Sequence, residues 1–281
     1  MNPIPLCDIL AEYDRHFPEN WRGVFAALAK AAQDRLWLAG PTSYLFSLAG
    51  QKFAVDPQIR RQTDLERVQD TLAADTASLS FVLITHPHAD HMCLPLMKLL
   101  RDTPIRWYIP ADIPDEMLRP ADLHPETVLR VRHGDVIREG DLAIHVFNSC
   151  HVRPGKKPYP QCGYAICSPA GNILMPVDVR DYSFRDYPDF GEVDLCLSHV
   201  WAGDDALHPE NYLPMLQQFA RFSAQFAARR YFLCHLYEIG RTEEFMWHHG
   251  HAAIASENLR ALLPDSLVEV PRLWEEYSLF G

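Results

Sequence analysis

The sequence predicts an α+β fold in which two β-sheets pack face to face and are covered by helices. Short apolar runs separated by turn residues fall into two blocks along the chain, as expected of two sheets. Helical patterns lie before, between and after these blocks. A hydrophobic content of 48% over 281 residues allows a substantial core.

Residues 1–35 are predicted to form a helical N-terminal extension, and residues 36–281 a single domain. Asn20 is the predicted N-cap of a helix, because apolar side chains recur after it at helical spacing: Trp21, Val24, Phe25, Leu28 and Ala32. From residue 36 the pattern changes to short apolar runs broken by glycine and proline. These runs predict strands over 36–39, 44–48 and 52–55.

The rest of the chain alternates further strands with helices. A buried strand over 80–85 precedes a helix over 94–101 and a strand over 105–109. A second block predicts strands over 128–131, 142–147, 163–167, 172–177 and 193–198. A helix is expected after His208, then a strand over 231–234 and a closing helix over 252–263. The His-rich stretch 247–251 is interpreted as the terminus of that last helix.

Charge and composition exclude several classes of protein. The balance of 26 Lys+Arg against 37 Asp+Glu gives a net charge of −11, which disfavours binding to nucleic acid or to an anionic membrane. The seven cysteines contain no C-x-x-C pair, and the first residues lack the pattern of a secretory signal. We therefore expect a cytoplasmic protein with a small-molecule substrate, and leave a homo-oligomer as an open alternative.

The most informative segment is the hexapeptide His86-Pro87-His88-Ala89-Asp90-His91. It places three imidazoles and one carboxylate directly after a predicted buried strand. Imidazole and carboxylate are the ligands that zinc and related divalent ions prefer. The segment therefore predicts a metal site, and the alternative is a polar surface loop rich in histidine.

Three further metal-capable residues occur at or soon after predicted strand ends. His151 follows the strand over 142–147, Asp178 follows 172–177 and His235 follows 231–234. Each alone is more typical of a surface residue or a cap. Their repeated placement, taken with the hexapeptide, favours a shared site for more than one ion.

With these residues in order, the chain resembles the metallo-β-lactamase-fold superfamily of metal-dependent hydrolases, over roughly residues 36–240. The early strands and Asp56 also resemble the opening of that fold. The resemblance implies an αββα four-layer sandwich of two mixed β-sheets flanked by helices, with the site at one edge. The branches that include phosphodiesterases and sugar-phosphate lactonases are the most similar.

The resemblance also implies a division of ligands. His86, His88 and His151 would bind the first ion, Asp90, His91 and His235 would bind the second, and Asp178 would bridge both. Two divalent ions are expected as cofactors, zinc first, with manganese or iron as alternatives. Such a pair lowers the pKa of a bound water from about 15.7 toward 7. The implied activity is hydrolysis of a small anionic ester, lactone or phosphodiester by a metal-bridging hydroxide.

Asp90, Asp178 and His208 are the predicted catalytic residues. In the related branches a histidine opens the helix before the last ligand and protonates the leaving group, and His208 occupies that place. The alternative is that His208 only caps the helix. His199 is a weaker candidate for the proton donor, and a partner of a ligand or a structural residue is the favoured interpretation of it.

Basic residues close to the ligands in sequence are the predicted contacts for an anionic substrate. Arg153 and Lys156 belong to the most basic loop of the chain, directly after His151. Arg180 and Arg241 follow Asp178 and His235. The alternative for each is a solvated surface charge.

Several other functions remain open at this point. A mononuclear iron oxygenase acting on glutathione persulfide shares the fold and differs in its metal. Flavodiiron proteins have a glutamate where this chain has His88 and need a flavin domain. A tRNA-processing endonuclease would need a basic surface, which the net charge disfavours. A non-catalytic binding protein would be expected to have lost ligands, and all seven positions are filled here.

Overall fold

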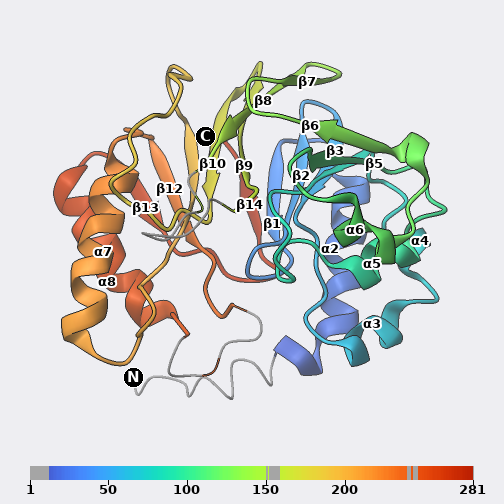
Figure 1. Ribbon diagram of the computed structural model, residues 1–281, viewed down its shortest axis with the longest axis horizontal. Helices are drawn as coiled ribbons and strands as arrows, with labels where there is room; N and C mark the ends of the chain where they lie inside the picture. The colour runs from blue at the N-terminus through green and yellow to red at the C-terminus, as the bar shows by residue number, and fades with distance from the viewer. Residues whose placement is uncertain (1–12, 150, 152–158, 239–241, 243–245, 281) are drawn as a thin grey trace.

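The computed structural model describes residues 13–149, 151, 159–238, 242 and 246–280 (Figure 1). Two seven-stranded sheets form its centre, with strand orders β14-β1-β2-β3-β4-β5-β6 and β13-β12-β11-β10-β9-β8-β7. Both sheets are mixed, because β1–β2 and β8–β9 are antiparallel whereas β3–β4 and β11–β12 are parallel. The predicted α+β sandwich of two mixed sheets is confirmed.

The strands follow the predicted apolar runs closely. The first sheet contains β1 (Arg35–Leu38), β2 (Tyr44–Leu48), β3 (Gln51–Val55), β4 (Phe81–Leu83), β5 (Arg106–Pro110), β6 (Val128–Val131) and β14 (Glu276–Ser278). The second contains β7 (Val136–Glu139), β8 (Leu142–Asn148), β9 (Cys162–Ser168), β10 (Gly171–Val177), β11 (Leu195–His199), β12 (Arg230–Cys234) and β13 (Leu267–Glu269).

Helices cover the outer face of each sheet (Figure 1). The first sheet is covered by α2 (Phe17–Lys30), α3 (Gln62–Val68), α4 (Leu72–Asp75), α5 (Leu94–Leu99) and α6 (Asp115–Leu118), with 3₁₀ turns at Arg119–Ala121 and Pro125–Thr127. The second sheet is covered by α7 (Pro209–Ala224) and α8 (His249–Leu262). This arrangement gives the four layers of an αββα sandwich.

Three apolar clusters hold these layers together, and β2 shows how. Successive side chains of a strand point to opposite faces. Leu45 therefore packs outward with α2, whereas Tyr44 and Phe46 pack inward between the sheets. In this inner layer Phe46, Phe53 and Phe81 stack across β2, β3 and β4 with ring centroids 4.8 and 4.7 Å apart.

Two local predictions differ from the structure. Helix α2 begins at Phe17, not after Asn20, because Pro18 is well accommodated in a first helical turn, and His16 is the N-cap. Strands β7, β13 and β14 were not predicted, because each combines a short length with charged residues and lacks a continuous apolar run. The interpretation of the 247–251 stretch is confirmed, since His248 is the N-cap of α8 and its ring accepts from Gly250 N.

The end of the chain links the two sheets. Because β13 belongs to the second sheet and β14 to the first, residues 270–275 must cross from one sheet to the other. Trp274 N donates to Leu38 O at 2.8 Å and so fixes this crossing segment to the end of β1. Across the described part of the chain, no helix has both the length and the apolar character needed to span a membrane.

Candidate metal centre

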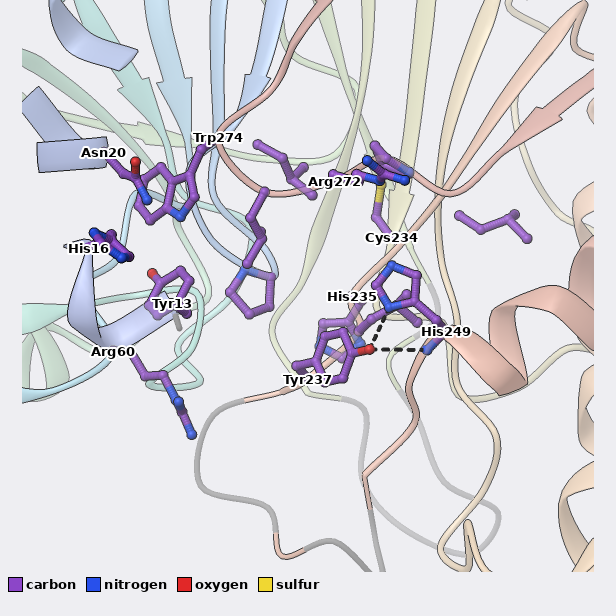
Figure 2. Close-up of a pocket in the computed structure, with 16 residues that line it drawn as sticks. Tyr13, His16, Asn20, Arg60, Cys234, His235, Tyr237, His249, Arg272 and Trp274 are labelled. Carbon is purple, nitrogen blue, oxygen red and sulfur yellow. Dashed lines mark hydrogen bonds between the residues drawn. The ribbon is translucent and has the colours of Figure 1, made fainter. Parts of the chain in front are cut away.

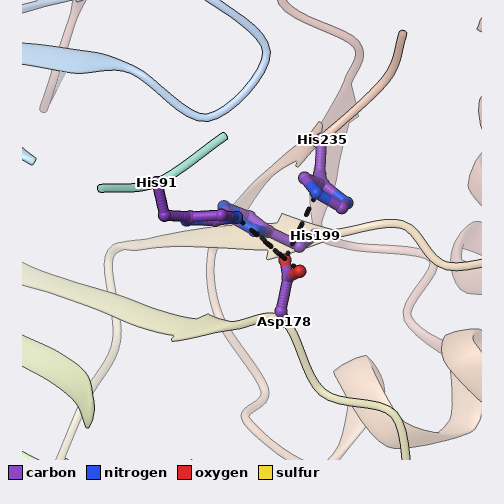
Figure 3. Close-up of side chains that lie close together, drawn as sticks. All are labelled: His91, Asp178, His199 and His235. Atoms are coloured by element: carbon purple, nitrogen blue, oxygen red, sulfur yellow. Dashed lines mark hydrogen bonds and ion pairs between the residues drawn. The ribbon is translucent and has the colours of Figure 1, made fainter. Parts of the chain in front are cut away.

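The predicted ligands meet at one edge of the sandwich. Residues 86–91 form the turn after β4, Asp178 follows β10 directly, and His235 follows β12 directly. Strands β10 and β12 both run parallel to β11, so their carboxyl ends lie at the same edge of the sheet. Figure 3 shows His91, Asp178 and His235 converging there, together with His199.

Strained backbone helps to aim these side chains. Val177 has φ +63° and His235 has φ +65°, in the left-handed region that residues with a Cβ rarely adopt. Val177 is β-branched, which makes its conformation a clear outlier, and it directly precedes Asp178. Such strain persists only where the surrounding structure enforces it, and it clusters at functional sites.

His86, His88 and His151 form the first group of possible metal ligands, and their ring nitrogens lie within 4.8 Å of one another. His86 Nε2 is 3.0 Å from His88 Nδ1. His151 Nδ1 donates to the backbone oxygen of Asp178 at 2.6 Å, which leaves its Nε2 free for a metal. Tyr159 stacks on His88 with ring centroids 4.4 Å apart and covers this group on one side.

Asp90, His91 and His235 lie next to this group. His235 Nε2 is 3.4 Å from Asp90 Oδ2, and His91 Nε2 is 3.6 Å from the same oxygen. All three residues are buried. The first trio of the implied division forms one possible ligand group, whereas the others are formed by His91, Asp178, His199 and His235, and by Asp90, His235 and Glu238.

Asp178 lies between the two groups. Its Oδ2 is 3.9 Å from His86 Nε2 and 3.6 Å from His91 Nε2, and its Oδ1 is 3.5 Å from His235 Nε2. The carboxylate thus faces ligand atoms of both groups, as a bridging ligand must.

Asp56, at the end of β3, holds the ring of His91. Its Oδ2 is 2.7 Å from His91 Nδ1, and its Oδ1 accepts from Thr85 N at 2.8 Å. The imidazole therefore donates from Nδ1 and presents Nε2 to the centre. A carboxylate behind a ligand histidine is the usual way in which proteins orient such a ring. The sequence indicated that Asp56 follows an early strand of the fold, but it did not predict the contact between Asp56 and His91.

His199 belongs to the centre but both of its nitrogens are engaged. Nδ1 is 2.8 Å from Asp178 Oδ1, and Nε2 is 2.6 Å from the hydroxyl of Tyr44. Asp178 can only accept, so His199 donates from Nδ1 and its Nε2 accepts from Tyr44. This tautomer makes His199 a partner of Asp178 and agrees with the favoured interpretation from sequence.

Glu238 is a residue of the centre that sequence reasoning missed. Its carboxylate forms a possible ligand group with Asp90 and His235, and Oε2 is 3.6 Å from His235 Nε2. An acidic residue three positions after a strand-end histidine was the available signal. The positive φ at His235 and Tyr237 reverses the chain and brings Glu238 back to the site.

The electrostatics of the two groups differ. Burial lowers the pKa of His86 well below its usual value and lowers that of His151 to about 4. Burial also disfavours the charged form of His91, but attraction to Asp90, Asp178 and Asp56 outweighs it and raises the His91 pKa well above its usual value. The carboxylates around the second group therefore favour positive charge there, either a proton on His91 or a metal ion.

These residues fit a bound metal ion by one further test. His91 Nε2 is buried and has no hydrogen-bond partner among the described residues, although it faces two carboxylates at 3.6 Å. A buried polar atom without a partner is costly unless something binds it. A divalent cation among these nitrogen and carboxylate atoms would satisfy it.

Arg180 is buried against the centre. Its Nη2 donates to Asp178 Oδ2 at 3.2 Å, and its guanidinium carbon lies 5.1 Å from the ring centre of Trp201 and 5.7 Å from that of Trp247. The charge of Arg180 is therefore balanced by a carboxylate of the chain itself. This contact orients Asp178 and favours a positioning role over the predicted substrate contact.

His208 lies at the surface as the N-cap of α7. Its Nδ1 is 2.7 Å from Asp205 Oδ2, its side chain is 61% exposed, and it belongs to none of the ligand groups. The hydrogen bond to Asp205 raises its pKa. The structure thus shows the cap position, and the role of proton donor stays a prediction. Three further predicted residues, Arg153, Lys156 and Arg241, lie outside the described residues.

Comparisons with known proteins identify the family and the fold. The family model described as "Beta-lactamase superfamily domain" matches residues 51–262. No curated protein sequence matches the chain. Among solved structures, the metallo-β-lactamase fold protein YhfI from Bacillus subtilis has a TM-score of 0.59 at 14% identity, over 87% of this chain and 98% of that one.

Two other structures show how varied the similar proteins are. Igni18, a metallo hydrolase from the archaeon Ignicoccus hospitalis, has a TM-score of 0.55 at 13% identity, over 87% of this chain and 97% of that one. CmlA, a diiron β-hydroxylase from Streptomyces venezuelae, has a TM-score of 0.58 at 16% identity. This match covers 88% of the present chain but only 54% of the CmlA chain. At these identities the likeness is one of fold.

The family match and the fold lead to one conclusion. The chain belongs to the β-lactamase superfamily domain family, has the metallo-β-lactamase fold, and carries a buried His/Asp cluster suited to binding metal.

Proposed function

We propose that this protein is a dinuclear metal hydrolase that cleaves a small ester, lactone or phosphodiester. The observation that carries the proposal is the position of Asp178. Its carboxylate lies 3.9 Å from His86 Nε2 in one ligand group and 3.5 Å from His235 Nε2 in the other. A carboxylate placed between two groups of possible ligands is able to bridge a pair of ions, and this supports the proposal.

The chain's own residues would bind and orient the ions. His86, His88 and His151 would hold one ion, and Asp90, His91 and His235 the other. When bound, such a pair lowers the pKa of a bound water and polarises the carbonyl or phosphoryl oxygen of the substrate.

Hydrogen bonds behind the ligands keep them in position. His199 donates to Asp178 and restrains the rotation of its carboxylate, while Arg180 holds the other oxygen. Burial lowers the pKa of His199 to about 4, so the ring stays neutral near pH 7 and keeps a single donor toward Asp178. Asp56 fixes His91 in the same way. The ligand atoms are thereby oriented before any substrate arrives.

An iron oxygenase is the second candidate, and Glu238 is the observation that favours it. With Glu238 the second group offers up to three carboxylates, and iron accepts such oxygen-rich sites. The fold also occurs in a diiron hydroxylase. The hydrolase remains preferred because the first group consists of three imidazoles, which suit zinc.

Metal analysis combined with activity profiling tests the proposal. Protein purified without added metal, and then loaded with Zn²⁺, Mn²⁺ or Fe²⁺, is assayed against phosphodiesters, lactones, thioesters and β-lactams, with Asp178→Ala as the blank. We expect two ions per chain and hydrolysis without oxygen consumption. One iron per chain, or turnover that depends on O₂, would contradict the hydrolase and support the oxygenase.

A further inference from the structure

A cavity of about 510 Å³ lies beside the candidate metal centre, between the two halves of the sandwich. Figure 2 shows Tyr13 and Trp274 on one side of it, and His235, Tyr237 and His249 on the other. The segment 271–274, which crosses between the sheets, also lines it.

The wall of this cavity is mostly carbon. Six of its lining residues are aliphatic side chains or prolines: Leu38, Pro41, Leu233, Leu236, Pro271 and Leu273. Trp274 adds an aromatic surface and is held by stacking on Tyr13, with ring centroids 5.2 Å apart and an interplanar angle of 23°. Apolar surface of this kind gains free energy when an apolar group displaces water from it.

The two guanidinium groups on the lining are already paired. Arg60 lies 3.6 Å from Asp14, and Arg272 lies 3.5 Å from Glu275. The positive charge of each guanidinium is therefore already offset by a carboxylate of the chain. The cavity is suited to an uncharged apolar group.

The cavity and the metal centre share a wall. His235 lines the cavity, while its Nε2 lies 3.4 Å from Asp90 and 3.5 Å from Asp178. Pro41 also lines the cavity and its oxygen accepts from His235 N at 3.2 Å, and the neighbouring Thr42 donates to the backbone oxygen of Asp90. A molecule bound at the centre is thus one residue away from the apolar space.

We propose that this cavity binds an apolar part of the substrate, an alkyl chain or an aromatic ring attached to the ester, lactone or phosphodiester. The inference rests on the proposed function for the reaction and adds the class of substrate. The volume of the cavity lies within the usual range of ligand pockets, about 300–1,000 Å³. Preferred substrates are therefore amphipathic, with the reactive bond at the metal centre and the apolar group against Trp274 and Leu273.

Binding is measured first, because it does not depend on catalysis. The probe is 1-anilinonaphthalene-8-sulfonate, titrated into the full-length protein with and without its metal, and displaced by butyrate, hexanoate or octanoate. We expect one saturable site in both states, and displacement that strengthens by up to about four-fold for each added methylene.

Variants locate the site. Leu273→Trp fills the cavity and is expected to weaken probe binding more than ten-fold. Leu262→Trp is the matched control, because Leu262 is 47% exposed on α8 and does not line the cavity. Trp274→Ala enlarges the cavity and is expected to shift the preference from octanoate to decanoate. Circular dichroism of each variant confirms that it folds.

The outcomes separate this inference from the proposed function. Saturable binding that Leu273→Trp abolishes supports the apolar site, even if no substrate in the panel is hydrolysed. Absence of saturable binding, or equal effects of Leu273→Trp and Leu262→Trp, overturns it. Hydrolysis whose kcat/KM is the same for butyl and octyl esters also overturns it, while leaving the hydrolase in place.

Discussion

The two ligand groups of the candidate centre share Asp178 but differ in charge. The first consists of three imidazoles, and burial lowers the pKa of each. The second places His91 among Asp56, Asp90 and Asp178, and these carboxylates raise its pKa. The first group offers neutral nitrogen ligands, whereas the second group is rich in negatively charged carboxylates.

This difference has consequences for the metals. Neutral imidazoles bind zinc without first losing a proton. The carboxylates of the second group, with Glu238 in reach, suit manganese or iron equally well. The two positions therefore need not prefer the same ion, and the comparison can be tested at each position separately.

Asp178→Ala should have the largest effect, because it removes the one group that both positions share. We expect metal content to fall from two ions to one or fewer per chain, and activity to fall to the level of metal-free protein. The change also leaves Arg180 buried without its carboxylate, which should cost about 3–5 kcal/mol of unfolding free energy. Metal analysis and denaturant unfolding measure both effects.

Asp186→Ala is the control for this variant, since Asp186 is an exposed aspartate a few residues further along the chain. Its metal content and stability should match those of the parent protein. Retention of two ions by Asp178→Ala would show that the two groups do not share this carboxylate.

Acid should separate the two groups. A metal must displace a proton from His91, whose pKa is raised, whereas His86, His88 and His151 have lowered pKa values and are already neutral near pH 7. As the pH falls from 7 to 5, affinity at the second position should drop by about ten-fold per unit for one proton. Affinity at the first should change little until the pH approaches the His151 pKa of about 4. Calorimetric Zn²⁺ titrations at several pH values measure this, and parallel losses at both positions would contradict the comparison.

Asp56→Asn should weaken the second position more than the first, because Asp56 contacts His91 directly. The amide is a poorer acceptor for His91 Nδ1–H, and loss of such a contact typically lowers metal affinity 10–100-fold. The first group meets Asp56 only through Thr85, whose hydroxyl lies 2.5 Å from Asp56 Oδ2 and 3.0 Å from His86 Nδ1, so its loss of affinity should be smaller. Competition with a coloured chelator measures the two affinities, with the exposed Asp70→Asn as control. Equal weakening of both positions would mean that Asp56 supports the whole edge of the fold.

The strand-end ligands were predictable because sequence shows both parts of the argument. Apolar runs mark where strands end, and histidine or aspartate at those ends identifies the chemistry. His151, Asp178 and His235 could be brought together on these grounds alone.

Other contacts could not be predicted, because they depend on side-chain directions in space. Glu238 reaches the centre only after the chain reverses at His235, a residue with positive φ that sequence does not reveal. Arg180 was predicted to contact an anionic substrate, yet it is buried near Trp201 and Trp247, which come from different loops. The roles of Glu238 and Arg180 can be recognised only from the three-dimensional structure.

Tyr44→Phe should have the smallest effect and tests how far the support of Asp178 extends. Removing the hydroxyl leaves Nε2 of His199 buried without its donor, while the bond from His199 to Asp178 can remain. We expect a loss of about 1–3 kcal/mol of unfolding free energy and a change in metal affinity below ten-fold. Tyr231→Phe is the matched control, because Tyr231 is an equally buried tyrosine near the start of β12, whose hydroxyl donates to Ser223 O and accepts from Ala228 N. Since both variants lose buried hydrogen bonding of a tyrosine hydroxyl, only an effect on metal affinity that is specific to Tyr44→Phe would show that the chain from Tyr44 through His199 orients the bridging carboxylate.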